Sequence, residues 1–247
     1  KFSMSNTNVK DYPEALSIAP YERMRIALCL AAVGGFLEAY TFTLKGGVFA
    51  NAQTGNLVTC AVRLAQRDPA AALRSLLPIV AFVLGIMLTE RLKRLPHENT
   101  PEQWHCIVIV TELALLLIVT FLPAGLPDFA TTLIVSFVCA LQYGSFRKTH
   151  GLPYATTFCT GNLRSAGTEL FKALQDHSTE AGHHARRYFT VVGVFFGGAL
   201  ISGLICPHLG QRSSILCCGV LVAVLIIFLL DYQKRKQFLK DVDPPQA

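Results

Sequence analysis

The chain has 247 residues, of which 52% are hydrophobic and only 15% are charged. An ordinary soluble domain carries about 25% charged residues, and a protein of this length has too little interior to bury so much apolar surface. The composition therefore excludes an ordinary soluble enzyme, a disordered chain and a small disulfide-linked secreted module.

Six segments are apolar enough to be membrane-spanning helices. A span needs about 20 apolar residues, and the bilayer has no water to satisfy an open backbone, so each segment must be helical. The segments are 26–44, 75–89 (extended to 70 if Arg74 snorkels), 103–126, 129–146, 188–211 and 213–230. Segments 49–64 and 154–174 are less apolar and rich in Thr, Asn, Gly and Ala. Each is expected to form a broken or re-entrant helical piece, although two full crossings would raise the count to eight.

The basic residues favour six spans with both termini in the cytoplasm. Six spans place most Lys and Arg residues on the side of the N-terminus, whereas eight spans leave Arg164 inside a helix. The chain is then a single membrane domain, 1–247, with polar cytoplasmic tails at 1–20 and 234–247. The net charge of +6 thus reflects topology, and nucleic acid is not an expected partner.

A tetrapeptide repeats within the chain. Thr54-Gly55-Asn56-Leu57 recurs as Thr160-Gly161-Asn162-Leu163, and each copy follows a strong span and an aromatic-Ala pair, Phe49-Ala50 or Tyr154-Ala155. The chain divides into halves at 24–126 and 127–233, each with three strong spans. An odd number of spans makes the second half enter from the opposite side, so an all-α 3+3 inverted repeat is predicted. Full crossing by the Thr-Gly-Asn segments would make the repeat parallel instead.

The motifs of both halves resemble one known family. In the first half these are residues 34–42 (GGFLEAYTF), 47–51 (GVFAN) and 54–56 (TGN), which resemble the signature of the YoaK-like bacterial membrane proteins. In the second half, Ala140-Leu141-Gln142, Thr156-Thr157 and Thr160-Gly161 resemble that family's second motif. The family commonly has Asp where this chain has Glu38, and it varies at the position of Asn162. The resemblance implies a compact, multi-pass protein of the bacterial inner membrane with about six spans and no established biochemical activity.

Glu38 lies deep in the first span, where an unpaired charge costs at least about 2.5–3.5 kcal/mol. It is a candidate proton or cation site facing the helix bundle, or else a neutral acid hydrogen-bonded to a neighbouring helix. The preceding Gly34-Gly35 pair allows a helix or a broken segment to approach closely. Glu112 in the third span is a secondary candidate, unless it lies near the membrane interface.

The two Thr-Gly-Asn segments supply the other candidate binding residues. Gly permits unusual backbone angles, and hydroxyl and amide groups replace the backbone hydrogen bonds that a broken helix loses. Helix N-termini and freed carbonyls near the midplane bind a small ion or polar solute in inverted repeats, while the alternative is tight packing with interhelical hydrogen bonds. The candidates are Asn51, Gln53, Thr54, Gly55, Asn56, Gln142, Thr156, Thr157, Thr160, Gly161 and Asn162.

Other residues receive simpler interpretations. The eight cysteines fall mostly in apolar runs and are expected to be buried apolar side chains, with a redox role for adjacent Cys217 and Cys218 as the alternative. Arg147 and Lys148 are expected to mark the cytoplasmic interface or, alternatively, to contact an anionic substrate. Sequence motifs of hydrolases, zinc proteases and nucleotide-binding enzymes are absent, so neither a cofactor nor a bound metal is expected.

Three functional hypotheses follow. The first is a small secondary transporter or channel-like carrier, with its site where the two Thr-Gly-Asn segments meet. The second is a non-transporting membrane scaffold or assembly protein in which these motifs are packing devices. The third is an intramembrane enzyme that uses Glu38, Glu112 or a cysteine. The expected partners are the lipid bilayer and an unidentified small solute or ion, and the sequence leaves a homo-oligomer open.

Overall fold

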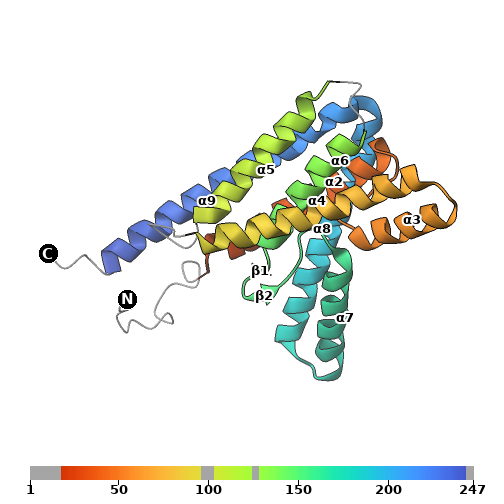
Figure 1. Cartoon of the computed structure of the whole chain (residues 1–247). Coiled ribbons are helices and arrows are strands. Elements are labelled where there is room, and N and C mark those ends of the chain that lie inside the picture. The colour runs from red at the N-terminus through yellow and green to blue at the C-terminus, as the bar shows by residue number, and fades with distance from the viewer. Residues whose placement is uncertain (1–17, 96–102, 124–127, 243–247) are drawn as a thin grey trace.

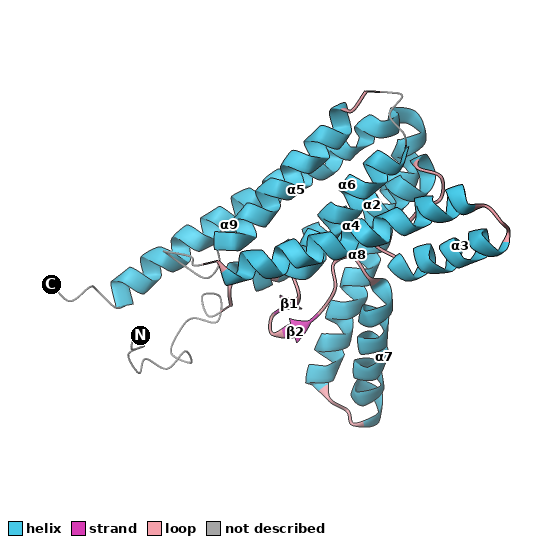
Figure 2. Cartoon of the chain, in the orientation of Figure 1, coloured by secondary structure: helices cyan, strands magenta, loops and turns pink. Residues whose placement is uncertain are grey.

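The computed structural model describes residues 18–95, 103–123 and 128–242. The predicted tail at 1–20 lies outside the described residues except for 18–20, and so does 243–247 of the second tail. The described chain is almost entirely helical, with one short hairpin of two strands (Figure 2).

Both predicted halves contain four α-helices, and the second of the four is the shortest in each half (Figure 1). The first half contains η2 (Pro20–Glu22), α2 (Met24–Leu44), α3 (Gln53–Ala65), α4 (Pro69–Arg94) and α5 (Gln103–Phe121). The second half contains α6 (Asp128–Ser145), β1 (Lys148–Thr149), β2 (Leu152–Pro153), α7 (Cys159–Gln175), α8 (Thr179–Leu209), η3 (Gly210–Ser214) and α9 (Ile215–Val242).

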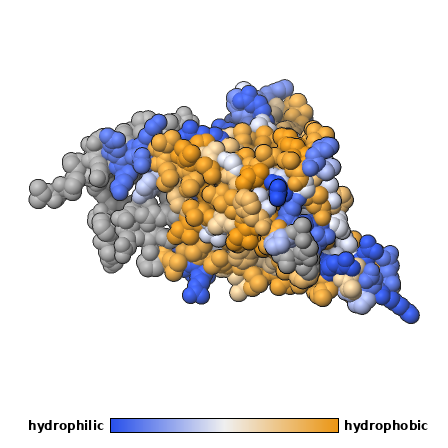
Figure 3. Space-filling model, turned by 90° about the horizontal axis from the view of Figure 1, so that it is seen from above, coloured by the Kyte–Doolittle hydropathy of each residue, from blue (hydrophilic) through white to orange (hydrophobic). Residues whose placement is uncertain are grey.

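Four helical stretches in the described residues are long and apolar enough to cross a membrane, rather than the six predicted. They are Met24–Leu44, Pro69–Arg94, Trp104–Phe121 and Thr179–Gln237. The last stretch combines α8 and α9, because only the 3-10 turn η3 lies between them; its first residue, Gly210, has a positive φ of 54° that ends α8. Helix α6 is not among the four, and its sequence includes the polar residues Asp128 and Gln142. Hydrophobic side chains nevertheless cover most of the surface seen in Figure 3.

Several predicted boundaries shift. Helix α8 begins at Thr179, ahead of the predicted 188, because Ser178 caps it by accepting a hydrogen bond from the Ala181 N–H at 3.2 Å. Helix α5 ends at Phe121 instead of 126. Helix α9 continues to Val242, so part of the predicted C-terminal tail is helical. Lys and Arg, which begin that tail, are good helix formers, and polarity alone does not end a helix.

Each long first helix packs along the third helix of the other half. Helix α2 packs on α8 and α6 packs on α4, while the short helices α3 and α7 lie against α4 and α8 respectively. Helices α5 and α9 run side by side (Figure 1). Helices α2 and α6 run antiparallel, because Lys45 after α2 pairs with Asp128 at the start of α6 at 3.1 Å, and the His150 N–H beyond α6 donates to the Glu22 carbonyl before α2.

Glycines allow two of these helix pairs to touch backbone to backbone, as expected for Gly34-Gly35. A methyl group added at Gly35 would lie 1.9 Å from the Phe195 carbonyl oxygen, and one at Gly198 would lie 2.2 Å from that of Ala32. The crossing of α2 and α8 therefore has no room for a side chain. Gly85 has the same role between α4 and α6, whereas Gly193, Gly197 and Gly203 have no such neighbour within 4 Å.

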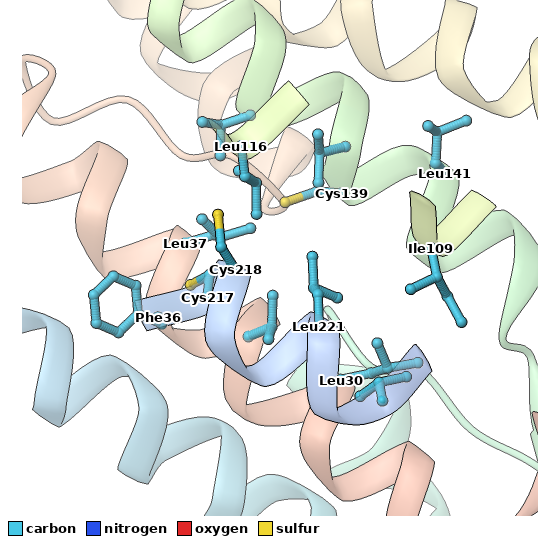
Figure 4. Close-up of a cluster of buried hydrophobic side chains, with 14 of the residues drawn as sticks. Leu30, Phe36, Leu37, Ile109, Leu116, Cys139, Leu141, Cys217, Cys218 and Leu221 are labelled. Carbon is cyan, nitrogen blue, oxygen red and sulfur yellow. The ribbon is translucent and has the colours of Figure 1, made fainter. Parts of the chain in front are cut away.

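The apolar core lies between α2, α5, α6 and α9 (Figure 4). Leu37 from α2, Leu116 from α5 and Leu221 from α9 are fully buried in it. Cys217 and Cys218 are buried in the same cluster, and every cysteine of the chain is free. These two cysteines therefore serve as buried apolar side chains in this structure.

We expect Gly35→Ala to destabilise the protein by about 1–3 kcal/mol, because the added methyl group must displace a backbone carbonyl of α8. Gly197→Ala in α8, the partner helix of the crossing, is the matched control. It should be neutral or slightly stabilising, since Ala has a higher helix propensity than Gly. Thermal melts of both purified variants in one detergent test this. Equal melting of Gly35→Ala and the parent would show that the crossing has room for a side chain.

Candidate functional site

The side chain of Glu38 caps the start of the short helix α3. Its two carboxylate oxygens accept hydrogen bonds from the backbone N–H groups of Asn51 and Ala52, at 2.6 and 3.0 Å. Ala52 is the N-cap residue of α3 and supplies no side-chain hydrogen bond of its own. A carboxylate at this position complements the positive end of the helix dipole. The acid that the sequence places deep in the first span thus binds the adjacent Thr-Gly-Asn segment.

The segments before α3 and α7 both reach the middle of α2 at Gly34. The Asn51 side chain donates a hydrogen bond to the Gly34 carbonyl at 3.1 Å. The segment before α7 lies against the same glycine. A methyl group added at Gly34 would lie 2.7 Å from the Thr156 carbonyl oxygen and 3.4 Å from the Thr157 Cα. The structure therefore brings Asn51, Thr156 and Thr157 together around one glycine.

The asparagines of the two motifs hold their own segments in the same way. Asn56 accepts a hydrogen bond from the Phe49 N–H at 3.0 Å and donates one to the Phe49 carbonyl at 2.7 Å. Asn162 forms the same pair of bonds with Ala155, at 3.0 and 2.7 Å. We call each arrangement an asparagine clamp. The clamps therefore make Phe49 equivalent to Ala155. The aromatic-Ala pairs had matched Phe49 with Tyr154, which differs by one residue.

Three polar side chains at this junction have buried oxygens with no hydrogen-bond partner among the described residues. They are Oδ1 of Asn51 and the hydroxyls of Thr156 and Thr157. The three side chains are between 0% and 2% exposed. A buried polar atom without a partner costs about 1–3 kcal/mol, so a group of them in one place is typical of a site that receives a ligand.

The start of α7 differs from that of α3. Both N-cap residues, Ala52 and Phe158, lack a side-chain capping bond, and neither first turn contains an acid, but only the segment before α3 receives a carboxylate from another helix among the described residues. Glu38 therefore has no counterpart that binds the start of α7 in the described structure. Phe158 packs its ring against Tyr143 of α6, with centroids 5.0 Å apart.

The other sequence-predicted candidates are dispersed. Gln53 joins the first clamp, since its side chain accepts from Asn56 and donates to the Ala50 carbonyl. Gln142 donates to the Leu30 carbonyl at 2.9 Å and so links α6 to α2. Gly55 makes room for the Phe49 ring. Three further candidates are exposed in the first turns of α3 and α7: Thr54, Thr160 and Gly161.

Glu112 lies fully buried in α5, and neither carboxyl oxygen has a hydrogen-bond partner among the described residues. A carboxylate without a partner is very costly in such a place, so Glu112 is best accommodated as the neutral acid.

Two pockets open at the two ends of α6. The larger, with a volume of about 520 Å³, lies beside α7 and includes Tyr143 from the end of α6 and Arg147 just beyond it. The smaller, about 240 Å³, includes Phe129 and Thr132 from its beginning. The junction at Gly34 contributes no residue to either lining.

The larger pocket has a positive balance of charge. Arg147 and Arg164 line it and form no ion pair among the described residues, whereas Glu169 pairs with Lys172 at 2.7 Å. The hydrogen bond from Lys172 lowers the pKa of Glu169, so this acid is ionised and already compensated. The two arginines favour negatively charged solutes at this pocket.

Sequence reasoning missed the pocket residues Tyr143 and Tyr188, which come from helices outside the motifs. No local signal identifies them, because they meet only when α6, α7 and α8 pack. The contact of Gly34 with Thr156 had a partial signal, since adjacent glycines in a span mark a close approach without naming its partner.

The chain belongs to the family described as "Protein of unknown function (DUF1275)", whose family model matches residues 26–227. This is the family under which the YoaK-like proteins are catalogued, so the resemblance of the motifs is confirmed. Comparisons with curated proteins and with solved structures give no match.

We expect Glu38→Gln to lower the free energy of unfolding by about 1–3 kcal/mol. The glutamine carbonyl can accept a hydrogen bond from only one of the Asn51 and Ala52 N–H groups. The NH₂ group of the glutamine would face the other N–H group, and two donors cannot form a hydrogen bond. Thr54→Ala, an exposed change in the first turn of the same helix, is the control and should stay within about 0.5 kcal/mol of the parent. Thermal melts decide, and unchanged melting of Glu38→Gln would mean that the cap adds nothing to stability.

Proposed function

We propose that this member of the DUF1275 family is a small secondary transporter or channel-like carrier for a small solute or ion. Its binding site is the junction where the two Thr-Gly-Asn segments reach Gly34. The observation that carries the proposal is the group of buried oxygens without partners on Asn51, Thr156 and Thr157. Buried polar atoms of this kind suit a solute that supplies the missing hydrogen bonds during passage.

An inverted 3+3 repeat is part of the proposal. It is supported by the exchanged packing, in which α2 lies on α8 and α6 on α4, and by the antiparallel course of α2 and α6. Helices α2, α4, α5, α6, α8 and α9 would each cross the membrane. In this arrangement α8 and α9 are separate spans that η3 joins at the surface.

Helices α3 and α7 would be re-entrant half-helices. At 1.5 Å per residue the 13-residue α3 is about 20 Å long, well short of the roughly 30 Å hydrocarbon core, and the 17-residue α7 contains Arg164, Glu169 and Lys172. Each follows an irregular segment, which is tolerated at membrane depth only where protein covers it or where it lines a cavity. The asparagine clamps supply the hydrogen bonds that these segments need.

The two pockets suit alternating access to a closed centre. They lie at opposite ends of α6, and the junction between them is buried. Glu38 is the proposed coupling group, since a proton on its carboxyl would remove an acceptor from the start of α3. Protonation would then be linked to the position of the half-helix beside the site.

The proposal places the chain in the bacterial inner membrane with both termini in the cytoplasm. Basic residues at the start of α2 and the end of α4 suit the cytoplasmic side. The chain would act on its solute without covalent chemistry, cofactor or metal, alone or as a homo-oligomer.

A second candidate function is a membrane scaffold or assembly protein. It is supported by the motif residues whose polar groups are occupied within the protein: Asn56 and Asn162 in the clamps, and Gln142 between helices. For a scaffold these bonds would be the purpose of the motifs.

The inverted repeat predicts the sides of the two short hairpins. Single cysteines placed at Arg67, between α3 and α4, and at Lys172, near the end of α7, should react with an impermeant reagent from opposite sides of the membrane. The measurement uses a cysteine-free background, with a cysteine at Lys234 as the control for the cytoplasmic side. Labelling of positions 67 and 172 from one side would rule out the inverted repeat.

The transport proposal predicts selective flux. Purified protein in liposomes should accelerate entry of at least one class of small solute among neutral polar molecules, monovalent anions and monovalent cations. Protein-free liposomes and liposomes with an unrelated helical membrane protein are the controls. If all three classes enter at the control rate at several pH values, the scaffold function replaces transport.

A further inference from the structure

The start of α3 shows how this motif binds a carboxylate. The Glu38 oxygens are held by two successive backbone N–H groups, those of Asn51 and Ala52, directly before the helix. The clamp of Asn56 on Phe49 sets the course of the segment that presents these groups. The motif is thus an oxyanion receptor at a helix N-terminus, where backbone N–H groups and the helix dipole favour negative charge.

The start of α7 repeats the receptor without the acid. Asn162 clamps Ala155 with the same two bonds, so the groups equivalent to Asn51 and Ala52 are those of Thr157 and Phe158. No side chain caps α7 at Phe158, and its first turn contains no acid. No carboxylate is hydrogen-bonded to the Thr157 or Phe158 N–H group among the described residues, although the charge of Glu38 acts on the neighbouring Cys159.

Two hydroxyls add donors at the same place. Thr156 and Thr157 immediately precede the N-cap of α7, are 0% and 2% exposed, and have no hydrogen-bond partner among the described residues. A hydroxyl donates readily to an oxyanion, and such charge-assisted bonds are about twice as strong as neutral ones.

The approach to α7 is also basic. The pocket of about 520 Å³ is lined by Ala155 and Asn162 of the clamp and by Arg147 and Arg164. A positively lined cleft raises the local concentration of anions and their rate of entry.

We infer that the start of α7 binds a small monovalent oxyanion, such as a carboxylate, in the position that the Glu38 carboxylate takes at α3. Thr156 and Thr157 are buried and line neither pocket, so the ligand we propose is a small one. That this anion is a transported substrate rests on the proposed function. The inference narrows the class of substrate from any small solute to small anions.

Sodium formate is the direct probe, because formate is the carboxylate group of Glu38 without its chain. We expect formate to raise the melting temperature of the purified protein by a few degrees once its concentration exceeds Kd about a hundredfold. Sodium gluconate at equal ionic strength is the control, since it carries the same charge on a larger body. Equal melting in the two salts would overturn the inference.

Variants locate the site. Thr157→Val keeps the shape of the side chain but removes the hydroxyl, and it should weaken formate binding about tenfold. Without formate it should melt no lower than the parent, because the lost hydroxyl has no partner. Thr157→Ser should retain the formate response, and so should Thr160→Val, an exposed change in the same turn. A formate response that Thr157→Val leaves intact would place the anion elsewhere and contradict the inference.

Formate uptake into liposomes separates the two proposals. Binding that depends on Thr157 without any flux would support the anion site and remove transport. Flux of a neutral solute or a cation, with no effect of formate on melting, would support transport and overturn the anion site. Saturable formate uptake that Thr157→Val reduces about tenfold would support both.

Discussion

Two adjacent glycines in the middle of α2 allow other parts of the chain to meet it without side chains between them. At Gly35 the backbone of α8 lies against that of α2, and at Gly34 the segment before α7 does the same. One turn further along, Glu38 holds the start of α3. The stretch from residue 34 to residue 38 therefore sets the positions of one long helix and both short ones. Because the contacts involve backbone atoms, the arrangement tolerates almost no added volume at either glycine.

The two Thr-Gly-Asn copies have one local fold and two electrostatic characters. Each asparagine clamps a residue 7 positions earlier, in the segment that precedes the short helix. Only the first copy has its helix start neutralised by an acid, and the acid comes from α2 rather than from the motif. The start of α7 has no such hydrogen-bonded acid among the described residues, so the two copies differ in this one contact.

Polar residues in so apolar a chain serve two distinct purposes. Asn56, Asn162 and Gln142 satisfy backbone groups and tie segments together, as irregular backbone in a membrane requires. Asn51, Thr156 and Thr157 retain oxygens without partners in the described structure. Residue type does not separate the two groups, since asparagine occurs in both. The distinction depends on which backbone groups lie within reach.

The sequence by itself determined the class of protein, the family, the order of the helices and the repeated motif. These are local properties, because hydropathy and a short motif are read from neighbouring residues. It also pointed to a close approach at Gly34-Gly35. The six crossings that it indicated stay a prediction, since four described helical stretches are long and apolar enough to cross a membrane and one of them joins α8 and α9. It gave no sign that α9 reaches Val242.

Only the tertiary structure decided what each polar candidate contacts. That Glu38 caps α3, that Gln142 bonds to α2 and that Thr156 lies at Gly34 all depend on segments that meet through folding. The same holds for the pockets at the two ends of α6, whose walls come from several helices. The physical reason is that a hydrogen bond is satisfied by any donor or acceptor within about 3 Å, and the packing of distant segments determines which one that is.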